Sequence, residues 1–228
     1  MISMPLGQWL KTVASRFKVQ FRDRKYIRSL IVSFCLLIGA LIINIFAGSY
    51  ATDHATSAVG DIILSNIPVV NVDEVFVFGP IIFWTIISLY ALSRPGTIPF
   101  WIKNVALFIV IRSIFITLTH IGPFPDHISL DSFSLSQHLN LFIFNSGADL
   151  FFSAHTGFPF LTALIFWKNY RMRVFCIIAS LFFGIVVLLG HLHYSIDVLA
   201  AFFITYSIYN IGVRAFRSDF EMSKLAGN

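Results

Sequence analysis

Charged side chains are scarce in this sequence, and their scarcity excludes an ordinary soluble fold. Asp, Glu, Lys and Arg make up only 12% of the 228 residues, about half the share of an average soluble domain. Hydrophobic residues account for 57%, including 26 Phe, which is more apolar surface than a water-facing domain of this length can bury. Cysteine is almost lacking, and Cys35 and Cys176 both lie inside apolar runs, so we expect two small hydrophobic side chains and no disulfide framework. The composition therefore predicts a multi-pass integral membrane protein.

Six apolar stretches are long enough to cross a bilayer as helices, because a hydrocarbon core of about 30 Å needs about 20 helical residues. They lie near 29–48, 75–93, 104–121, 150–167, 174–190 and 194–213. We therefore expect an all-α membrane protein with six transmembrane helices. Its single catalytic domain covers 29–213, preceded by a basic cytoplasmic segment over 1–28 and followed by a cytoplasmic tail over 214–228.

The sixteen Lys and Arg residues predict how these helices are oriented. All except Arg112 precede the first helix, flank the loops after the second and fourth helices, or follow the sixth helix. By the positive-inside rule, both termini and these two loops are cytoplasmic. The same rule accounts for the net charge of +5 without a nucleic-acid partner.

Histidines have the opposite distribution. They lie in, or at helix ends next to, the non-cytoplasmic loops: His54, His120, His127, His138, His155, His191 and His193. We therefore expect the active site on the non-cytoplasmic face.

The basic segment over 1–28 has two interpretations. It forms an amphipathic helix on anionic lipid, with Met4, Leu6, Trp9, Leu10 and Val13 on one side, or it is an unstructured basic tail. The sequence leaves both open.

The segment from His191 to Asp197 stands at the entrance to the sixth expected helix. His193 and Asp197 are four residues apart, so on a helix they share a face within hydrogen-bonding reach. An Asp in that position can hold a proton on one imidazole nitrogen and leave the other nitrogen free as a nucleophile or base. A helix-capping or interfacial polar cluster is the alternative, but an ionisable pair inside a membrane span is costly and indicates a functional site.

Two further polar residues interrupt apolar helices. His155 lies about one and a half turns into the fourth expected helix, at a depth similar to that of His193, which indicates acid/base or nucleophilic chemistry. Arg112 lies in the middle of the third helix, where its guanidinium either forms a structural ion pair or binds a phosphate through paired hydrogen bonds. At about 1.5 Å per residue it lies roughly 12 Å below the helix end, so it must reach outward to contact a phosphate.

These motifs resemble the sphingomyelin synthase branch of the type 2 phosphatidic acid phosphatase superfamily, whose members carry Ser-Gly-His-Thr and His-x-His-Tyr-Thr-x-Asp-Val segments. The matching segments are Ser153-Ala-His155-Thr156 and His191-Leu-His193-Tyr-Ser-Ile-Asp197-Val198. The broader superfamily usually has Lys-x6-Arg-Pro before the first motif and a Ser-Arg pair before the second. This chain has Ile87 in place of the Lys, and Val186 and Val187 in place of the pair, which favours the synthase branch.

The resemblance implies a phosphotransferase that moves a phospho-headgroup in two steps through a phosphohistidine, without a metal or other cofactor. His193 resembles the nucleophile, Asp197 its orienting partner and His155 the acid/base. The expected substrate contacts are Arg112, Ser153, His191 and Tyr194.

The expected partners are a phospholipid donor and a lipid alcohol acceptor such as ceramide, and a homo-oligomer is left open. With water as the acceptor, the same site is a lipid phosphatase or phospholipase C-like hydrolase. A transporter with Arg112 and the histidines along an ion path is an alternative of another class. A zinc enzyme built on His155, His191 and His193 is a further alternative.

Overall fold

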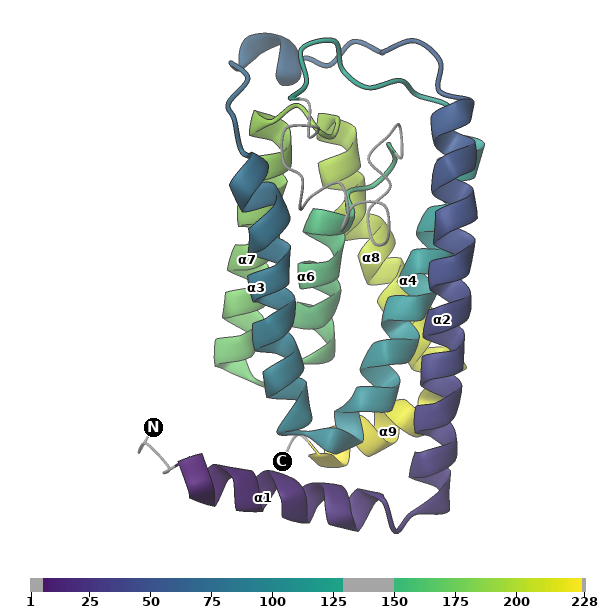
Figure 1. Ribbon diagram of the computed structural model, residues 1–228, viewed down its shortest axis with the longest axis vertical. Helices are drawn as coiled ribbons and strands as arrows, with labels where there is room; N and C mark the ends of the chain where they lie inside the picture. The colour runs from purple at the N-terminus through teal and green to yellow at the C-terminus, as the bar shows by residue number, and fades with distance from the viewer. Residues whose placement is uncertain (1–5, 129–149, 227–228) are drawn as a thin grey trace.

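The structure is a computed structural model that describes residues 6–128 and 150–226 (Figure 1). Within these residues, five helices are long and apolar enough to cross a membrane. They are α2 (Arg24–Asp53), α3 (Asp73–Leu92), α4 (Ile98–Leu118), α7 (Tyr170–Leu189) and α8 (Ser195–Ala215). Both cysteines are free, as expected. These apolar helices fit an integral membrane protein.

The helix expected over 150–167 is shorter than a full span. It is α6 (Ala154–Ile165), which has 12 residues and is therefore about 18 Å long. The four residues before it are not helical, because Ser153 ends the extended segment as the N-cap, with φ −61° and ψ 122°. The sixth expected span is thus a half-length helix inside the bundle.

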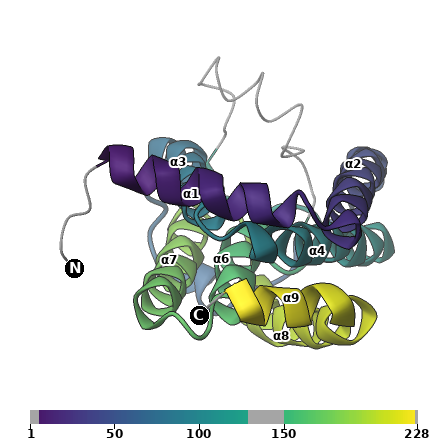
Figure 2. The same cartoon turned by 90° about the horizontal axis from the view of Figure 1, so that it is seen from below.

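Helix α6 lies at the centre of the bundle, where it packs against α7 on one side and α8 on the other (Figures 1 and 2). Helix α4 joins this group through α8 and also packs along α2. Helix α3 lies at the other edge and packs mainly against α7. The central position of α6 explains why nine of its twelve residues are buried.

Two glycines allow α6 to approach its neighbours closely. A Cβ on Gly157 of α6 would lie 2.7 Å from the Phe108 ring of α4. A Cβ on Gly184 of α7 would lie 3.1 Å from Val198 of α8 and 3.4 Å from Thr156 of α6. Larger side chains at these positions would push the central helix away from the helices that hold it.

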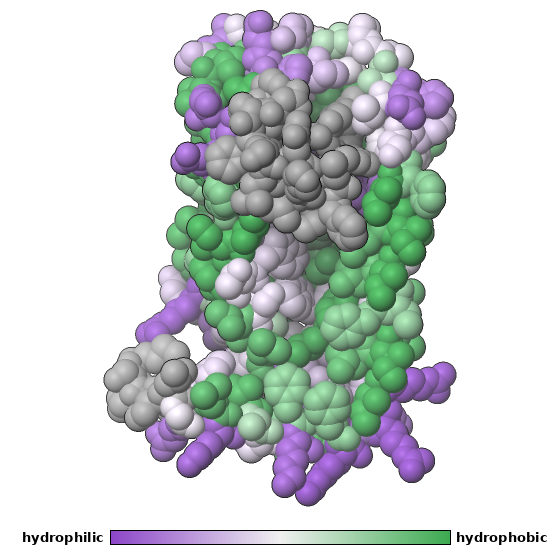
Figure 3. Space-filling view, viewed as in Figure 1, coloured by the Kyte–Doolittle hydropathy of each residue, from purple (hydrophilic) through white to green (hydrophobic). Residues whose placement is uncertain are grey.

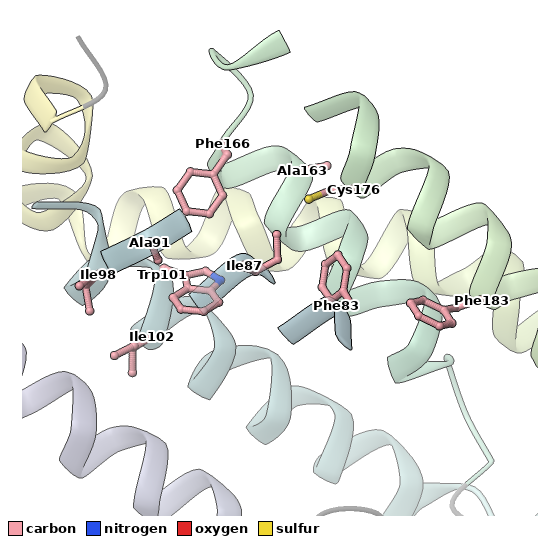
Figure 4. Packing of buried hydrophobic residues seen from close by; sticks show 10 residues of the cluster. All are labelled: Phe83, Ile87, Ala91, Ile98, Trp101, Ile102, Ala163, Phe166, Cys176 and Phe183. Atoms are coloured by element: carbon pink, nitrogen blue, oxygen red, sulfur yellow. The ribbon is translucent and has the colours of Figure 1, made fainter. Parts of the chain in front are cut away.

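The largest hydrophobic cluster among the described residues extends from the basic half of the bundle to the Phe183 ring beside His155 (Figure 4). It joins α3, α4, α6 and α7 through residues such as Phe83, Trp101, Phe166 and Phe183. Cys176 belongs to this cluster and is fully buried, so it acts as the small hydrophobic residue expected from its position. Outside this core, the surface in Figure 3 is apolar over the middle of the helices, with hydrophilic residues near both ends.

Two short helices lie across one end of the bundle, which we call the basic end. Helix α1 (Leu6–Gln20) runs across the foot of the bundle, and α9 (Arg217–Ala226) packs at the same end against α4 and α8 (Figures 1 and 2). Arg16 of α1 donates a hydrogen bond to the carbonyl of Ser93 over 2.6 Å, and the Tyr26 hydroxyl donates to the carbonyl of Pro95 over 3.1 Å. The first segment is therefore helical over Leu6–Gln20 and not an unstructured tail. Met4 lies outside the described residues.

A buried ion pair holds α9 against the bundle. Lys103 of α4 lies 2.5 Å from Asp219 of α9, and both side chains are less than 10% exposed. Ser29 of α2 accepts a hydrogen bond from Lys103 over 2.8 Å and donates one to Asp219 over 2.5 Å. The segment expected to be a tail therefore folds back onto α2 and α4.

Candidate active site

The two histidine motifs meet at the starts of α6 and α8, at the end of the bundle opposite the basic end. The backbone N–H of Ser153 donates a hydrogen bond to the carbonyl of Asp197 over 3.0 Å. The Ser153 side chain caps α6 by accepting from the N–H of Thr156 over 3.4 Å. Because Ser153 is fully buried, this contact fixes the first turn of α6 against the first turn of α8.

His193 and Asp197 form the expected pair. The Nδ1 atom of His193 lies 3.2 Å from a carboxylate oxygen of Asp197. That same oxygen accepts the backbone N–H of Tyr194, the N-cap residue of α8, over 3.1 Å. No residue in the described ranges hydrogen-bonds Nε2 of His193. The contact expected between Asp197 and one ring nitrogen of His193 is therefore present, and the orienting role of Asp197 stays a prediction.

His155 is the second residue of α6 and is 7% exposed. Its ring stacks on Phe76 of α3, with centroids 4.1 Å apart, and meets Phe183 of α7 edge-on at 6.3 Å. His193 and Arg112 are near enough to interact electrostatically with it. His155 thus lies at the N-terminus of α6 and not one and a half turns inside a helix, because that helix begins four residues later than expected.

A narrow apolar pocket adjoins His155. Its walls come from α3, α6 and α7 and include Pro80, Trp84 and Phe158. The pocket has room for roughly one water molecule. Any lipid chain that enters here must therefore displace part of its wall.

Arg112 is 6% exposed and reaches the site without extending outward. Its Nε donates a hydrogen bond to the carbonyl of Phe152 over 3.3 Å. The non-helical residues before α6 enter the bundle as far as the level of Arg112 on α4, so the Phe152 carbonyl meets the guanidinium there. The depth of Arg112 is therefore matched by the depth at which α6 begins.

His191 and Tyr194 lie in the same loop but have different surroundings. His191 has a left-handed backbone, with φ 52°, which is uncommon for a non-glycine residue. Its ring is buried against Phe124, and neither ring nitrogen has a hydrogen-bond partner among the described residues. The Tyr194 hydroxyl instead donates to the carbonyl of Gly122 over 2.8 Å and accepts the N–H of Val59 over 3.2 Å. In this structure Tyr194 therefore connects two loops at the site end, and the substrate contact expected of it stays a prediction.

Sequence reasoning missed Asp61, which supports α8 from the loop after α2. One of its carboxylate oxygens accepts the N–H of Ser195 over 2.7 Å, and the other accepts the N–H groups of Ile63 and Leu64 over 2.8 and 3.1 Å. Burial opposes ionisation of Asp61, but these N–H donors outweigh it and lower the pKa of the carboxyl. An Asp before a short helical turn is a recognisable cap signal, whereas its contact with Ser195 has no local signature.

Residues 147–213 match the family model described as PAP2 superfamily C-terminal. The match supports membership of the PAP2 superfamily. It includes His155, His193 and Asp197, while Arg112 and Asp61 lie outside it. Members of the PAP2 superfamily are phosphatases and phosphotransferases, which supports an enzyme with a lipid phosphatase or phosphotransferase type of activity. No curated protein and no solved structure matches the chain.

The PAP2-like site does not present a metal-binding arrangement in the described part of the chain. No three His, Cys, Asp or Glu residues there are placed to hold a metal ion. His155, His191 and His193 are all among the residues described, so the three-histidine zinc site considered from the sequence has no geometric support.

Proposed function

We propose that the protein is a membrane phospholipid headgroup phosphotransferase of the sphingomyelin synthase type. It moves the phospho-headgroup of a glycerophospholipid to a lipid alcohol through a phosphohistidine. The observation that carries the proposal is the Asp197–His193 pair beside His155 at the buried junction of α6 and α8. A carboxylate on Nδ1 leaves Nε2 of His193 as the nucleophilic atom.

In the first step, Nε2 of His193 attacks the phosphorus of the donor. A phosphorus–nitrogen bond forms, and the bond from phosphorus to the diacylglycerol oxygen breaks. His155, protonated in the presence of the phosphodiester anion, donates its proton to the departing oxygen. Asp197 stabilises the positive charge that develops on the His193 ring.

In the second step, His155 removes the proton from the acceptor hydroxyl. The acceptor oxygen attacks phosphorus, the phosphorus–nitrogen bond breaks, and His193 returns to its neutral form. A lipid alcohol such as ceramide gives transfer, whereas water gives hydrolysis. The burial of His155 and His193, 7% and 6% exposed, supports transfer because it restricts access of water.

Two features of the site suit the negative charge of a phosphate. Arg112 brings a guanidinium that can form paired hydrogen bonds with phosphate oxygens. The N-terminus of α6 begins beside it, and helix N-termini favour anions through their unpaired N–H groups and dipole. Together they would hold the phosphoryl group in front of His193.

We also propose that the basic end faces the cytoplasm and that the active site lies on the opposite face. Fifteen of the sixteen Lys and Arg residues belong to the basic end or its flanking turns, and Arg112 is the remaining one. The described histidines lie toward the other end, while His138 falls outside the described residues. Single cysteines at 127 and 170 in a background lacking Cys35 and Cys176 test this: an impermeant thiol reagent should label intact cells at 127 only.

The activity is tested with purified protein in mixed micelles containing labelled phospholipid donors, with and without ceramide. Transfer predicts a labelled phosphosphingolipid that appears only with ceramide, together with diacylglycerol. Diacylglycerol or free phosphate formed at the same rate without ceramide would instead assign hydrolysis. His127→Ala is the control variant, because His127 is an exposed histidine hydrogen-bonded to a backbone carbonyl outside the site.

The two histidine roles are separated by a donor with a good leaving group, such as a nitrophenyl phosphodiester. His193→Ala should form no protein-bound phosphate with any donor. His155→Ala should lose roughly 10²- to 10⁴-fold in turnover of natural lipids, with a smaller loss for the nitrophenyl donor, and it should accumulate an acid-labile, base-stable adduct. If His193→Ala still forms the adduct and His155→Ala cannot, the roles are reversed.

A further inference from the structure

A hollow on the outer face of α2, at the basic end, has the composition of a lipid-binding site. It is lined by Arg24, Ile27, Arg28, Ile31 and Val32. These residues follow the spacing i, i+3, i+4, i+7 and i+8, so they share one face of the helix. The volume of the hollow is about 260 Å³, enough for several groups the size of a water molecule, which takes about 30 Å³ in the liquid.

The two arginines of this hollow are available for a ligand. Both are exposed, and neither forms an ion pair or hydrogen bond with another described residue. They lie one turn apart at the start of α2, where two guanidinium groups can contact the same phosphate. Within the described fold, the pair therefore has no protein partner that would compete with a phosphate.

The apolar residues lie on the side of the hollow that is nearer to the middle of α2. Ile31 and Val32 are 58% and 40% exposed and follow Arg28 by about one turn toward the apolar middle of α2. A phospholipid has the same order of groups: a charged phosphate at the interface, and acyl chains below it. An acidic peptide or a free phosphate would match the arginines but leave the exposed isoleucine and valine without a partner.

We propose that this hollow binds one anionic phospholipid. Arg24 and Arg28 contact its phosphate, and an acyl chain lies along Ile27, Ile31 and Val32. Because the hollow is at the opposite end of the bundle from His155, this lipid is not the reacting donor. It would hold the junction between α1 and α2 at the membrane surface, and it does not depend on the proposed transferase activity.

The test is native mass spectrometry of the full-length protein in detergent, titrated with phosphatidylglycerol or with phosphatidylcholine of the same acyl chains. Arg24→Gln/Arg28→Gln should weaken phosphatidylglycerol binding by about 25-fold, since each of the two cations in contact with the lipid phosphate contributes about five-fold. The matched control is Arg22→Gln/Lys25→Gln, which removes the same charge from the same segment outside the hollow. It should weaken binding by less than about threefold.

Ile31→Ser separates a lipid from a phosphate ion. It should weaken phosphatidylglycerol binding while leaving any binding of inorganic phosphate unchanged. The proposal is overturned if the control variant loses as much affinity as Arg24→Gln/Arg28→Gln, if phosphatidylcholine binds as tightly as phosphatidylglycerol, or if inorganic phosphate displaces the lipid at equal concentration. Unchanged thermal unfolding of each variant shows that the substitutions have not altered the fold.

Discussion

Removing the negative charge of Asp219 should destabilise the protein far more than its position near the C-terminus suggests. Asp219→Asn leaves the Lys103 ammonium without its counter-ion, 7% exposed between α2, α4 and α9. At 2.5 Å and an effective dielectric constant of about 20, the lost attraction is about 6–7 kcal/mol. Part of that attraction offsets the cost of burying the two charges, so the expected loss of unfolding free energy is about 3–5 kcal/mol.

The measurement is unfolding of the purified protein in mixed detergent micelles, followed by circular dichroism. Glu221→Gln is the matched control, because Glu221 pairs with Lys224 on the same helix, with side chains 55% and 40% exposed. An exposed pair contributes less than about 1 kcal/mol. Hydrogen exchange should show faster exchange of the α9 amides in Asp219→Asn than in the control.

A double substitution distinguishes charge from packing. Lys103→Met/Asp219→Leu removes both charges and keeps apolar volume, so most of the stability lost in Asp219→Asn should return. If Asp219→Asn costs no more than Glu221→Gln, the buried pair does not hold α9. If the double variant is as unstable as Asp219→Asn, the loss comes from packing and the electrostatic reasoning is wrong.

Three further predictions concern the site end. Because the pKa of Asp61 is lowered in the folded protein, its carboxylate stabilises the fold fully above about pH 4, the pKa of an unfolded Asp. This stability is lost as the pH falls through the lowered folded pKa. The thermal unfolding temperatures of wild type and Asp61→Asn, measured from pH 7 to pH 3, should therefore converge at the acid end. Gly157→Ala places a Cβ 2.7 Å from the Phe108 ring and should lower the unfolding free energy by about 1–3 kcal/mol. The control Gly39→Ala adds a Cβ in open space and should cost nothing. Equal effects of the two substitutions would refute the close-packing argument. Chelators should leave turnover unchanged, and loss of turnover restored by zinc alone would contradict the metal-independent mechanism.

The long helices could be predicted from the sequence because each one depends on a continuous apolar run that the sequence shows directly. The pairing of His193 with Asp197 was predictable from their spacing of four residues. His193 nevertheless precedes α8, and Asp197 meets it with the same oxygen that accepts the N–H of Tyr194 at the start of the helix. In both cases the controlling interaction is local.

The contacts that set the position of α6 are not local, and they could not be predicted. The start of α6 depends on the hydrogen bond from Ser153 to the carbonyl of Asp197, and apolar periodicity continues on both sides of that point. Asp61 and Ser195 meet although they are 134 residues apart in the sequence. The sequence identifies Lys103 only as an orientation signal, because its partner, Asp219, lies in a segment whose fold the sequence does not reveal.

The short length of α6 has a consequence for the depth at which the reaction takes place. At about 18 Å, the helix is about 12 Å shorter than the hydrocarbon core, and Figure 1 shows it beginning below the outer ends of α7 and α8. Trp167 and Lys168 follow it, and such residues anchor a helix end at the interface. His155 then lies well inside the membrane, so in the proposed reaction the donor phosphate would have to sink below the plane of its neighbouring headgroups. The protein therefore has a hydrophobic mismatch at its own centre, and a bilayer with longer acyl chains would increase the distance between the headgroup plane and His155.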